Sequence, residues 1–100
     1  MNPEDNAPPS PYSARVMAKP VNFYCGATEA TLVQLEGDFS GWTRLPMMRR
    51  IDGWWFLQVP LTHGHHRYRF VVDGQPALDP RATGVARNEG QEPVSVVAVS

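Results

Sequence analysis

Short stretches of alternating apolar and polar residues run through most of this chain, and turn residues separate them. No segment keeps the roughly 3.6-residue apolar period of an amphipathic helix, so the pattern predicts strands. The turns carry Ala-Thr-Glu, Asp-Gly or His-Gly, and strands this short and closely spaced predict an all-β, antiparallel β-sandwich. The expected strands are Val21–Tyr24, Thr31–Glu36, Met47–Ile51, Trp54–Leu61, Arg67–Asp73 and Val94–Val99.

The start of the chain has a different composition from the rest. Four of the ten prolines fall within residues 1–11, among Asn, Ser, Glu and Asp and without apolar periodicity. Such a segment cannot bury enough apolar surface to fold. We therefore expect a disordered Pro-rich tail over residues 1–17 and one β-sandwich domain over residues 18–100.

Parity along two neighbouring strands predicts which side chains face the core. The core-facing set is Trp55, Leu57, Val59 and Leu61 on the first strand, and Tyr68, Phe70 and Val72 on the second. Matching these sets across the intervening turn pairs Phe56 with Val71 and Gln58 with Arg69. The sequence thus predicts a hairpin whose outer face carries Trp54, Phe56 and Arg69 together.

Two large aromatic residues on the outside of a hairpin need an explanation. A cluster of exposed apolar side chains marks a binding surface or a surface that another element covers. For Trp54 and Phe56, the cover could be the N-terminal tail or a second copy of the chain. The sequence leaves these alternatives open.

The run Gly37-Asp38-Phe39-Ser40-Gly41-Trp42 ends a strand with glycines and leaves an indole just beyond it. Phe39 can close over the core face, whereas Trp42 falls on an irregular connection. An indole there suits stacking on a ring-shaped ligand, with its N–H free to donate one hydrogen bond. A lid over the edge of the sandwich is the other interpretation of Trp42.

Length and charge limit the classes of function. A core built from 100 residues is too small for a deep enclosed active site, so a surface groove is expected. Nine basic and ten acidic residues give a net charge of −1, which argues against nucleic acid or an anionic membrane as a partner. The single cysteine and the absence of a secretory signal or apolar span favour a reducing, cytoplasmic location.

Other groups of reactive side chains fit structural roles better than chemistry. His63, His65 and His66 lie beside one turn, but a structural metal site needs about four ligands, so we expect a solvated turn with no metal or cofactor. Cys25 has apolar neighbours and lacks a histidine context, which indicates an inert thiol. The aspartates that could suggest glycoside hydrolysis lie in turns or before proline: Asp38, Asp52, Asp73 and Asp79. The sequence predicts no catalytic residue and no enzyme.

An ordered series of motifs resembles the family 48 carbohydrate-binding modules. The series is Gly37-Asp38-Phe39-Ser40-Gly41-Trp42, Leu45-Pro46-Met47, Asp52-Gly53-Trp54-Trp55, Gly64 to Gly74 and Leu78-Asp79-Pro80. This family includes the glycogen-binding domain of AMP-activated kinase β-subunits and the N-terminal domains of glycogen-branching and debranching enzymes. The resemblance covers about Val21 to Val99. It implies an immunoglobulin-like early-set sandwich that binds α-1,4-linked glucan without cleaving it.

The resemblance also implies particular binding residues. The family's tryptophan after the Gly-x-Phe turn matches Trp42, and its basic residue on the Tyr-x-Phe strand matches Arg69. The family's second stacking tryptophan is replaced by Pro76. In the late loop, Asn88 and Gln91 are the candidate contacts.

The outer aromatic residues offer a second possibility within this reading. Trp54 and Phe56 could supply a replacement platform beside Arg69, according to the predicted pairing. The implied ligand is glycogen, starch or a maltooligosaccharide. The alternative function is a protein-interaction module that uses the Trp54 and Phe56 face for a second copy of the chain or another partner. A regulatory domain for a carbohydrate-active enzyme is a third possibility.

Overall fold

The computed structural model describes residues 17–100, which form strands and one short 3-10 helix. The predicted tail over residues 1–17 lies outside the described residues, apart from Met17. The elements are β1 (Lys19–Cys25), β2 (Val33–Gly37), η1 (Asp38–Ser40), β3 (Leu45–Pro46), β4 (Met48–Arg49), β5 (Trp55–Leu61), β6 (Gly64–Val72), β7 (Gln75–Ala77), β8 (Gly84–Arg87) and β9 (Pro93–Val99).

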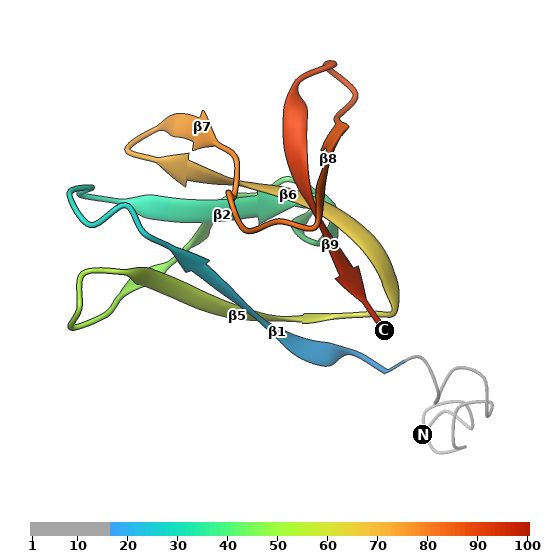
Figure 1. The fold of residues 1–100 in the computed structure, drawn as a ribbon, viewed down its shortest axis with the longest axis horizontal. Coiled ribbons are helices and arrows are strands. Elements are labelled where there is room, and N and C mark those ends of the chain that lie inside the picture. Colours follow the sequence, from blue (N-terminus) through green and yellow to red (C-terminus); the bar gives the residue numbers. More distant parts are fainter. Residues whose placement is uncertain (1–16) are drawn as a thin grey trace, which may run out of the picture.

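Two antiparallel sheets face each other. The smaller sheet has the strand order β1-β5-β4, and the larger has the order β3-β2-β6-β9-β8, with β7 also paired to β6. Figure 1 shows the layer that contains β1 and β5 below the layer that contains β2 and β6. This arrangement confirms the predicted all-β, immunoglobulin-like antiparallel sandwich. Within residues 17–100, no helix is long and apolar enough to cross a membrane.

The hydrophobic core lies between the inner faces of the two sheets. Phe23 of β1 contributes from one sheet, and its ring meets that of Tyr68 on β6 edge-on, with centroids 4.9 Å apart. Leu35 and Phe70 are almost fully buried beside them. Phe39 of η1 closes the core at one end, with its ring 5.9 Å from that of Phe23. Each fully buried side chain of this size stabilises the fold by roughly 1.5 to 3 kcal/mol.

The predicted core parity is confirmed, but the predicted hairpin between β5 and β6 is wrong. Phe56 of β5 pairs with Tyr24 and Met48 in the smaller sheet, whereas Arg69 of β6 pairs with Glu36 in the larger sheet. The turn after β5 therefore carries the chain from one sheet to the other. Both sheets of a sandwich turn their apolar faces inward, so parity identifies the buried face and leaves the choice of sheet undetermined.

Candidate binding groove

Trp42 is held in place by the turn that ends β2. Its backbone N–H donates to the Gly37 carbonyl at 2.8 Å, and Ser40 Oγ donates to the same carbonyl at 3.1 Å. Gly37 is required for this turn, because a Cβ there would lie 2.4 Å from the Phe39 ring. Gly41 and Trp42 both have left-handed backbones, with φ of 59° and 63°. The turn therefore orders an indole that strand geometry alone would not place here.

The backbone of Trp42 is unusual for a bulky residue. A non-glycine residue in the left-handed region costs on the order of 1 to 3 kcal/mol, and such strain gathers at functional sites. Within the described residues, Trp42 is half-buried and does not belong to the hydrophobic core. It lies instead on the outer side of the larger sheet, where it lines a groove with Arg69. This position does not support the interpretation of Trp42 as a core lid.

Arg69 lies on that outer face and is held by two carboxylates. Its Nε donates to Glu36 Oε2 at 2.6 Å, and its Nη1 donates to Glu92 Oε1 at 3.1 Å. Glu36 is opposite Arg69 in the register of β2 and β6, and its side chain is 6% exposed. Arg44 Nε lies 3.5 Å from the other oxygen of Glu36. The guanidinium plane of Arg69 is thus fixed against the sheet.

Hydrogen bonds within the charge network around Arg69 favour the ionised forms of Arg69 and Glu92. Hydrogen bonding to Glu36, the largest cause, raises the pKa of Arg69, and Glu92 adds to this effect. The hydrogen bond from Arg69 in turn lowers the pKa of the Glu92 carboxyl. The Arg69 guanidinium therefore stays charged where it lines the groove, and the ionised Glu92 carboxylate lies in the hollow that Arg69 shares with Pro76.

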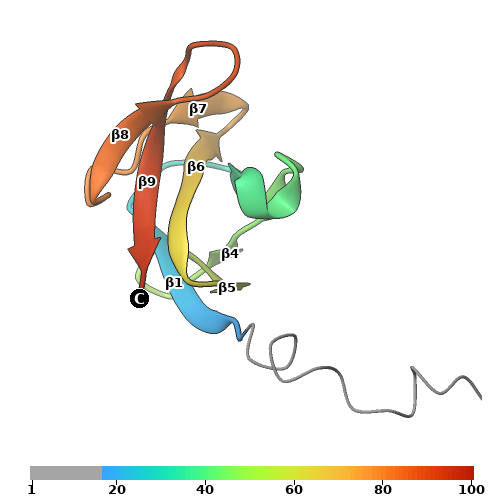
Figure 2. The same ribbon diagram turned by 90° about the vertical axis from the view of Figure 1, so that its right-hand side faces the viewer.

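Two adjoining hollows make up this groove, and they share Trp42, Asn88 and Glu89. The hollow beside Arg69 has a volume of about 340 Å³. The other, of about 490 Å³, continues past Trp42 to His65 and Arg67. Figure 2 shows η1 on one side of β6 and the β8–β9 hairpin on the other. Asp38 of η1 lines the larger hollow from one side, and Asn88 and Glu89 of the hairpin line it as well. The result is an open surface groove, as the length of the chain predicts.

The loop between β8 and β9 contributes one of its two predicted residues. Asn88 lines both hollows, and its Oδ1 accepts from the Glu92 backbone N–H at 2.9 Å. Gln91 is not among the residues described as lining the groove. Its φ of 65° and the bond from its backbone N–H to the Asn88 carbonyl give it a role in the turn. The resemblance pointed to this loop but could not separate the two roles.

Trp54 and Phe56 lie on the other sheet, so their predicted position beside Arg69 is wrong. The Phe56 ring packs 5.2 Å from that of Tyr24 on the outer face of the smaller sheet. The Arg81 guanidinium lies 4.9 Å above the Trp54 ring. Neither aromatic residue lines the groove beside Trp42. The error follows directly from the wrong pairing of β5 with β6.

Pro76 occupies the far side of Arg69 from Trp42. It pairs with Val71 on β6 and is exposed, and it lines a hollow of about 160 Å³ with Arg69 and Glu92. The position at which the resemblance expects a second tryptophan therefore adjoins the groove. A proline ring there offers less stacking area and no N–H donor.

Sequence analysis missed the acidic partners of Arg69, Glu36 and Glu92. Glu36 has the outward parity of β2, so its pairing with Arg69 could have been inferred once these two strands were known to be neighbours. Asp38 was considered only as a candidate acid. Its carboxylate accepts from the Arg67 backbone N–H at 3.0 Å and lies 3.5 Å from His66 Nδ1, which ties η1 to β6.

The remaining candidate acids also hold backbone groups in place. The bonds run from Thr31 N–H to Asp73 at 2.9 Å, from Trp54 N–H to Asp52 at 3.0 Å and from Arg81 N–H to Asp79 at 2.9 Å.

Burial, the largest cause, raises the pKa of the Cys25 thiol and keeps it protonated, in keeping with the inert thiol expected. Within residues 17–100, no group of three or more His, Cys, Asp or Glu side chains could hold a metal ion.

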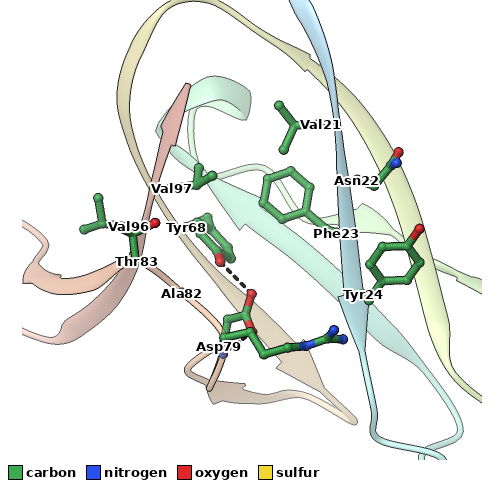
Figure 3. Close-up of a pocket in the computed structure, with 11 residues that line it drawn as sticks. Val21, Asn22, Phe23, Tyr24, Tyr68, Asp79, Ala82, Thr83, Val96 and Val97 are labelled. Atoms are coloured by element: carbon green, nitrogen blue, oxygen red, sulfur yellow. Dashed lines mark hydrogen bonds between the residues drawn. The ribbon is translucent and has the colours of Figure 1, made fainter. Parts of the chain in front are cut away.

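A smaller pocket of about 180 Å³ opens between β1 and β9, away from Trp42. Figure 3 shows Tyr68 pointing across it to Asp79. The Tyr68 hydroxyl donates to Asp79 Oδ2 at 2.6 Å, and Ser95 Oγ accepts from the Asp79 N–H at 2.8 Å. Burial, reinforced by this hydrogen bond, raises the pKa of Tyr68 well above its ordinary value. Asp79 therefore fastens the segment after β7 to the larger sheet.

Comparison with known proteins places the chain in a family. Residues 21–100 match the family described as the glycogen recognition site of AMP-activated protein kinase. The 1,4-alpha-glucan branching enzyme GlgB 2 of Xanthomonas oryzae pv. oryzae is 37% identical over 84 residues, which cover 79% of this chain and 11% of the enzyme. The beta-1 subunit of 5'-AMP-activated protein kinase from Homo sapiens is 40% identical over 48 residues, which cover 48% of this chain and 17% of the subunit.

These matches confirm the resemblance on which the site residues were assigned. The chain spans a small part of the length of either relative, so the match concerns this domain and not the whole of those proteins. Since the family match covers nearly all of the described residues, the chain belongs to the family of the glycogen recognition site of AMP-activated protein kinase.

Proposed function

We propose that this domain binds α-1,4-linked glucan in the groove beside Trp42 and does not cleave it. The observation that carries the proposal is the position of Trp42. Its indole is held half-buried by a strained turn, on the outer face that also carries Arg69 and Asn88. Membership of a glycogen-recognition family and the similarity to an α-glucan branching enzyme support this choice of ligand.

In the proposed complex, the face of a glucose ring and its edge make different contacts. The C–H face of the sugar stacks on the Trp42 indole, as apolar ring surfaces do. Hydroxyls at the ring edge accept from the Arg69 guanidinium and the Asn88 amide, and donate to the Glu89 carboxylate. The groove is open and has few polar anchors, so we expect dissociation constants from micromolar to millimolar, roughly 4 to 8 kcal/mol of binding free energy.

The proposed role is binding without catalysis. Three of the candidate carboxylates, Asp52, Asp73 and Asp79, accept backbone hydrogen bonds away from the groove. Asp38 does line the groove, but its carboxylate accepts the Arg67 N–H. The family match is to a glycogen recognition site, which favours binding over cleavage.

A second candidate function uses the outer face of the smaller sheet. Met48 lies opposite Phe56 on this face and is 68% exposed, and Ile51 beyond it is fully exposed. We call these two residues, Phe56 and the half-buried Trp54 the β5 patch, although the Arg81 guanidinium lies over the Trp54 ring. Clustered apolar residues of this kind favour a protein partner or a second copy of the chain.

Titration with maltoheptaose, followed by NMR, tests the leading proposal. Shifts should concentrate on Trp42, Arg69 and the loop around Asn88, and should disappear in Trp42→Ala. Trp54→Ala provides the matched control, since it removes an indole from the other sheet and should leave sugar binding intact. A wild-type protein that shows no shifts, or shifts confined to the β5 patch, would overturn the proposal.

A further inference from the structure

The groove does not end at Trp42. On the side away from Arg69 it continues into the larger hollow, of about 490 Å³ against about 340 Å³ beside Arg69. Trp42 lines both hollows, so a chain stacked on its ring can extend in either direction. The Arg69 side leads to Pro76, where a large stacking surface is missing. The roomier path leads to His65 and Arg67.

We propose that this larger hollow is a second sugar subsite, which takes the further glucose units of the same α-glucan. This inference rests on the proposed function of the groove. His65 and Arg67 supply donors from β6, and Asp38 and Glu89 supply acceptors from the two walls. The subsite would make binding depend on the length of the oligosaccharide.

The mixed charge of the hollow selects a neutral, polyhydroxy ligand. An anionic ligand would meet the carboxylates of Asp38 and Glu89, and a cationic one would meet Arg67. A sugar carries hydroxyls that both donate and accept, so it can use all of these groups at once. Val96, opposite Arg67 in the register of β6 and β9, adds an apolar side chain to the lining that suits the C–H face of a glucose ring.

The donor strand is held rigidly enough to present these groups. The backbone N–H of Arg67 donates to Asp38, as described above, and its Nη1 donates to the Arg87 carbonyl of β8 at 3.2 Å. A guanidinium has five N–H donors, so most remain for a ligand. The ring of the neighbouring His66 is also held in place, with its Nε2 2.8 Å from the Thr62 carbonyl. The backbone that carries His65 and Arg67 is therefore ordered before a ligand binds.

Affinities for a short and a long oligosaccharide test the subsite. We would measure the binding of maltotriose and maltoheptaose to wild type, Arg67→Ala, His65→Ala and Trp42→Ala by isothermal titration calorimetry. Arg67→Ala should weaken maltoheptaose binding by about tenfold, equivalent to about 1.4 kcal/mol. Maltotriose, bound at Trp42, should keep its affinity within about twofold, because one intact hollow suffices for it. Trp42→Ala should weaken the binding of both sugars.

His63→Ala is the matched control for His65→Ala, since His63 lies two residues away and does not line the hollow. The NMR spectrum of each variant verifies that the sandwich is intact, and His65→Ala tests the subsite should Arg67→Ala fail to fold. If both folded variants bind maltoheptaose as tightly as wild type does, the subsite is refuted and the binding role of Trp42 stands. If wild type binds neither sugar, the proposed function fails and the subsite with it.

Discussion

Glu36 and Arg69 face each other across β2 and β6, and a 2.6 Å hydrogen bond joins them on the outer side of the larger sheet. Glu36 is almost fully buried there, although its parity points away from the core. A buried carboxylate is tolerated because charged partners satisfy it. The pair therefore serves the fold and orients a candidate ligand donor at the same time.

Removal of Arg69 should destabilise the domain as well as weaken sugar binding. Arg69→Ala leaves Glu36 buried, with Arg44 as its remaining cationic neighbour at 3.5 Å. We expect a loss of roughly 3 kcal/mol in the free energy of unfolding, the lower end for a broken buried pair. Urea denaturation measures this loss in the free energy of unfolding. Glu92→Gln is the control, because its pair with Arg69 is solvent-exposed and should contribute little to stability; equal losses in both variants would contradict this account.

The strained backbone of Trp42 predicts that, of the substitutions at this position, glycine gives the most stable variant. Glycine adopts a φ of 63° freely, whereas a residue with a Cβ pays roughly 1 to 2 kcal/mol there. Trp42→Gly should therefore melt at a higher temperature than Trp42→Ala, and neither variant should bind maltoheptaose. Calorimetry measures the melting temperatures, and sugar titration measures the loss of binding. A Trp42→Ala variant that is as stable as Trp42→Gly would show that the turn carries no such strain.

Pro76 marks a position at which affinity can be increased. An exposed tryptophan there would give a second stacking surface next to Arg69. Pro76→Trp should tighten maltoheptaose binding by about 1 to 3 kcal/mol, the range for one stacked aromatic ring taken from nucleic-acid bases. Pro76→Ala should change affinity little. A folded Pro76→Trp variant that binds no more tightly than wild type would place the sugar away from this side of the groove.

The sequence predicted the buried faces well because burial depends on local alternation. Trp55, Tyr68 and Phe70 all lie in the core, as their apolar spacing along single strands indicates. The pairing of strands depends on contacts distant in sequence, and parity cannot report those. For the same reason, the predicted pairing placed Trp54 and Phe56 beside Arg69 and not in the smaller sheet.

Short strands and paired charges escaped prediction for a different reason. Three of the short strands contain residues that read as breakers, Pro46 in β3, Pro76 in β7 and Gly84 in β8, so they showed no strand pattern. The buried role of Glu36 becomes apparent only after β2 is placed beside β6. Trp42 was singled out from its turn alone, since Gly37 and Gly41 before it already indicate an ordered bend.

The hydrogen bond from Tyr68 to Asp79 predicts a particular response to alkaline pH. The neutral phenol is favoured in the folded state, so the pKa of Tyr68 is raised above its unfolded value of about 10. The stability that Tyr68 contributes is therefore fully present below pH 10 and decreases as pH rises above it. At pH 7, Tyr68→Phe should cost about 1 to 2 kcal/mol.

Urea denaturation of wild type and Tyr68→Phe at pH 7 and above pH 10 measures this dependence. Phenylalanine does not titrate, so the stability difference between the two proteins should shrink at the higher pH. Phe56→Leu is a control on the outer face of the smaller sheet; it removes no titratable group, so its stability difference from wild type should stay constant. A Tyr68→Phe difference that stays constant or grows would contradict the assigned role of this hydrogen bond.

The β5 patch predicts self-association that sugar does not affect. Trp54 lies flat against Gly26, where an added Cβ would come within 3.0 Å of the indole, so the ring is fixed as part of an apolar surface. Exposed Met48 and Ile51 extend that surface on the sheet that does not carry the groove. Removal of an apolar anchor from an interface commonly costs 2 kcal/mol or more at a hot spot.

Sedimentation across a hundredfold concentration range should therefore show a wild-type dimer that Trp54→Ser dissociates, with or without maltoheptaose. Since the groove lies on the opposite sheet, Trp42→Ala should dimerise like wild type. A wild-type protein that stays monomeric throughout, or a dimer that maltoheptaose dissociates, would contradict the separation of the two faces.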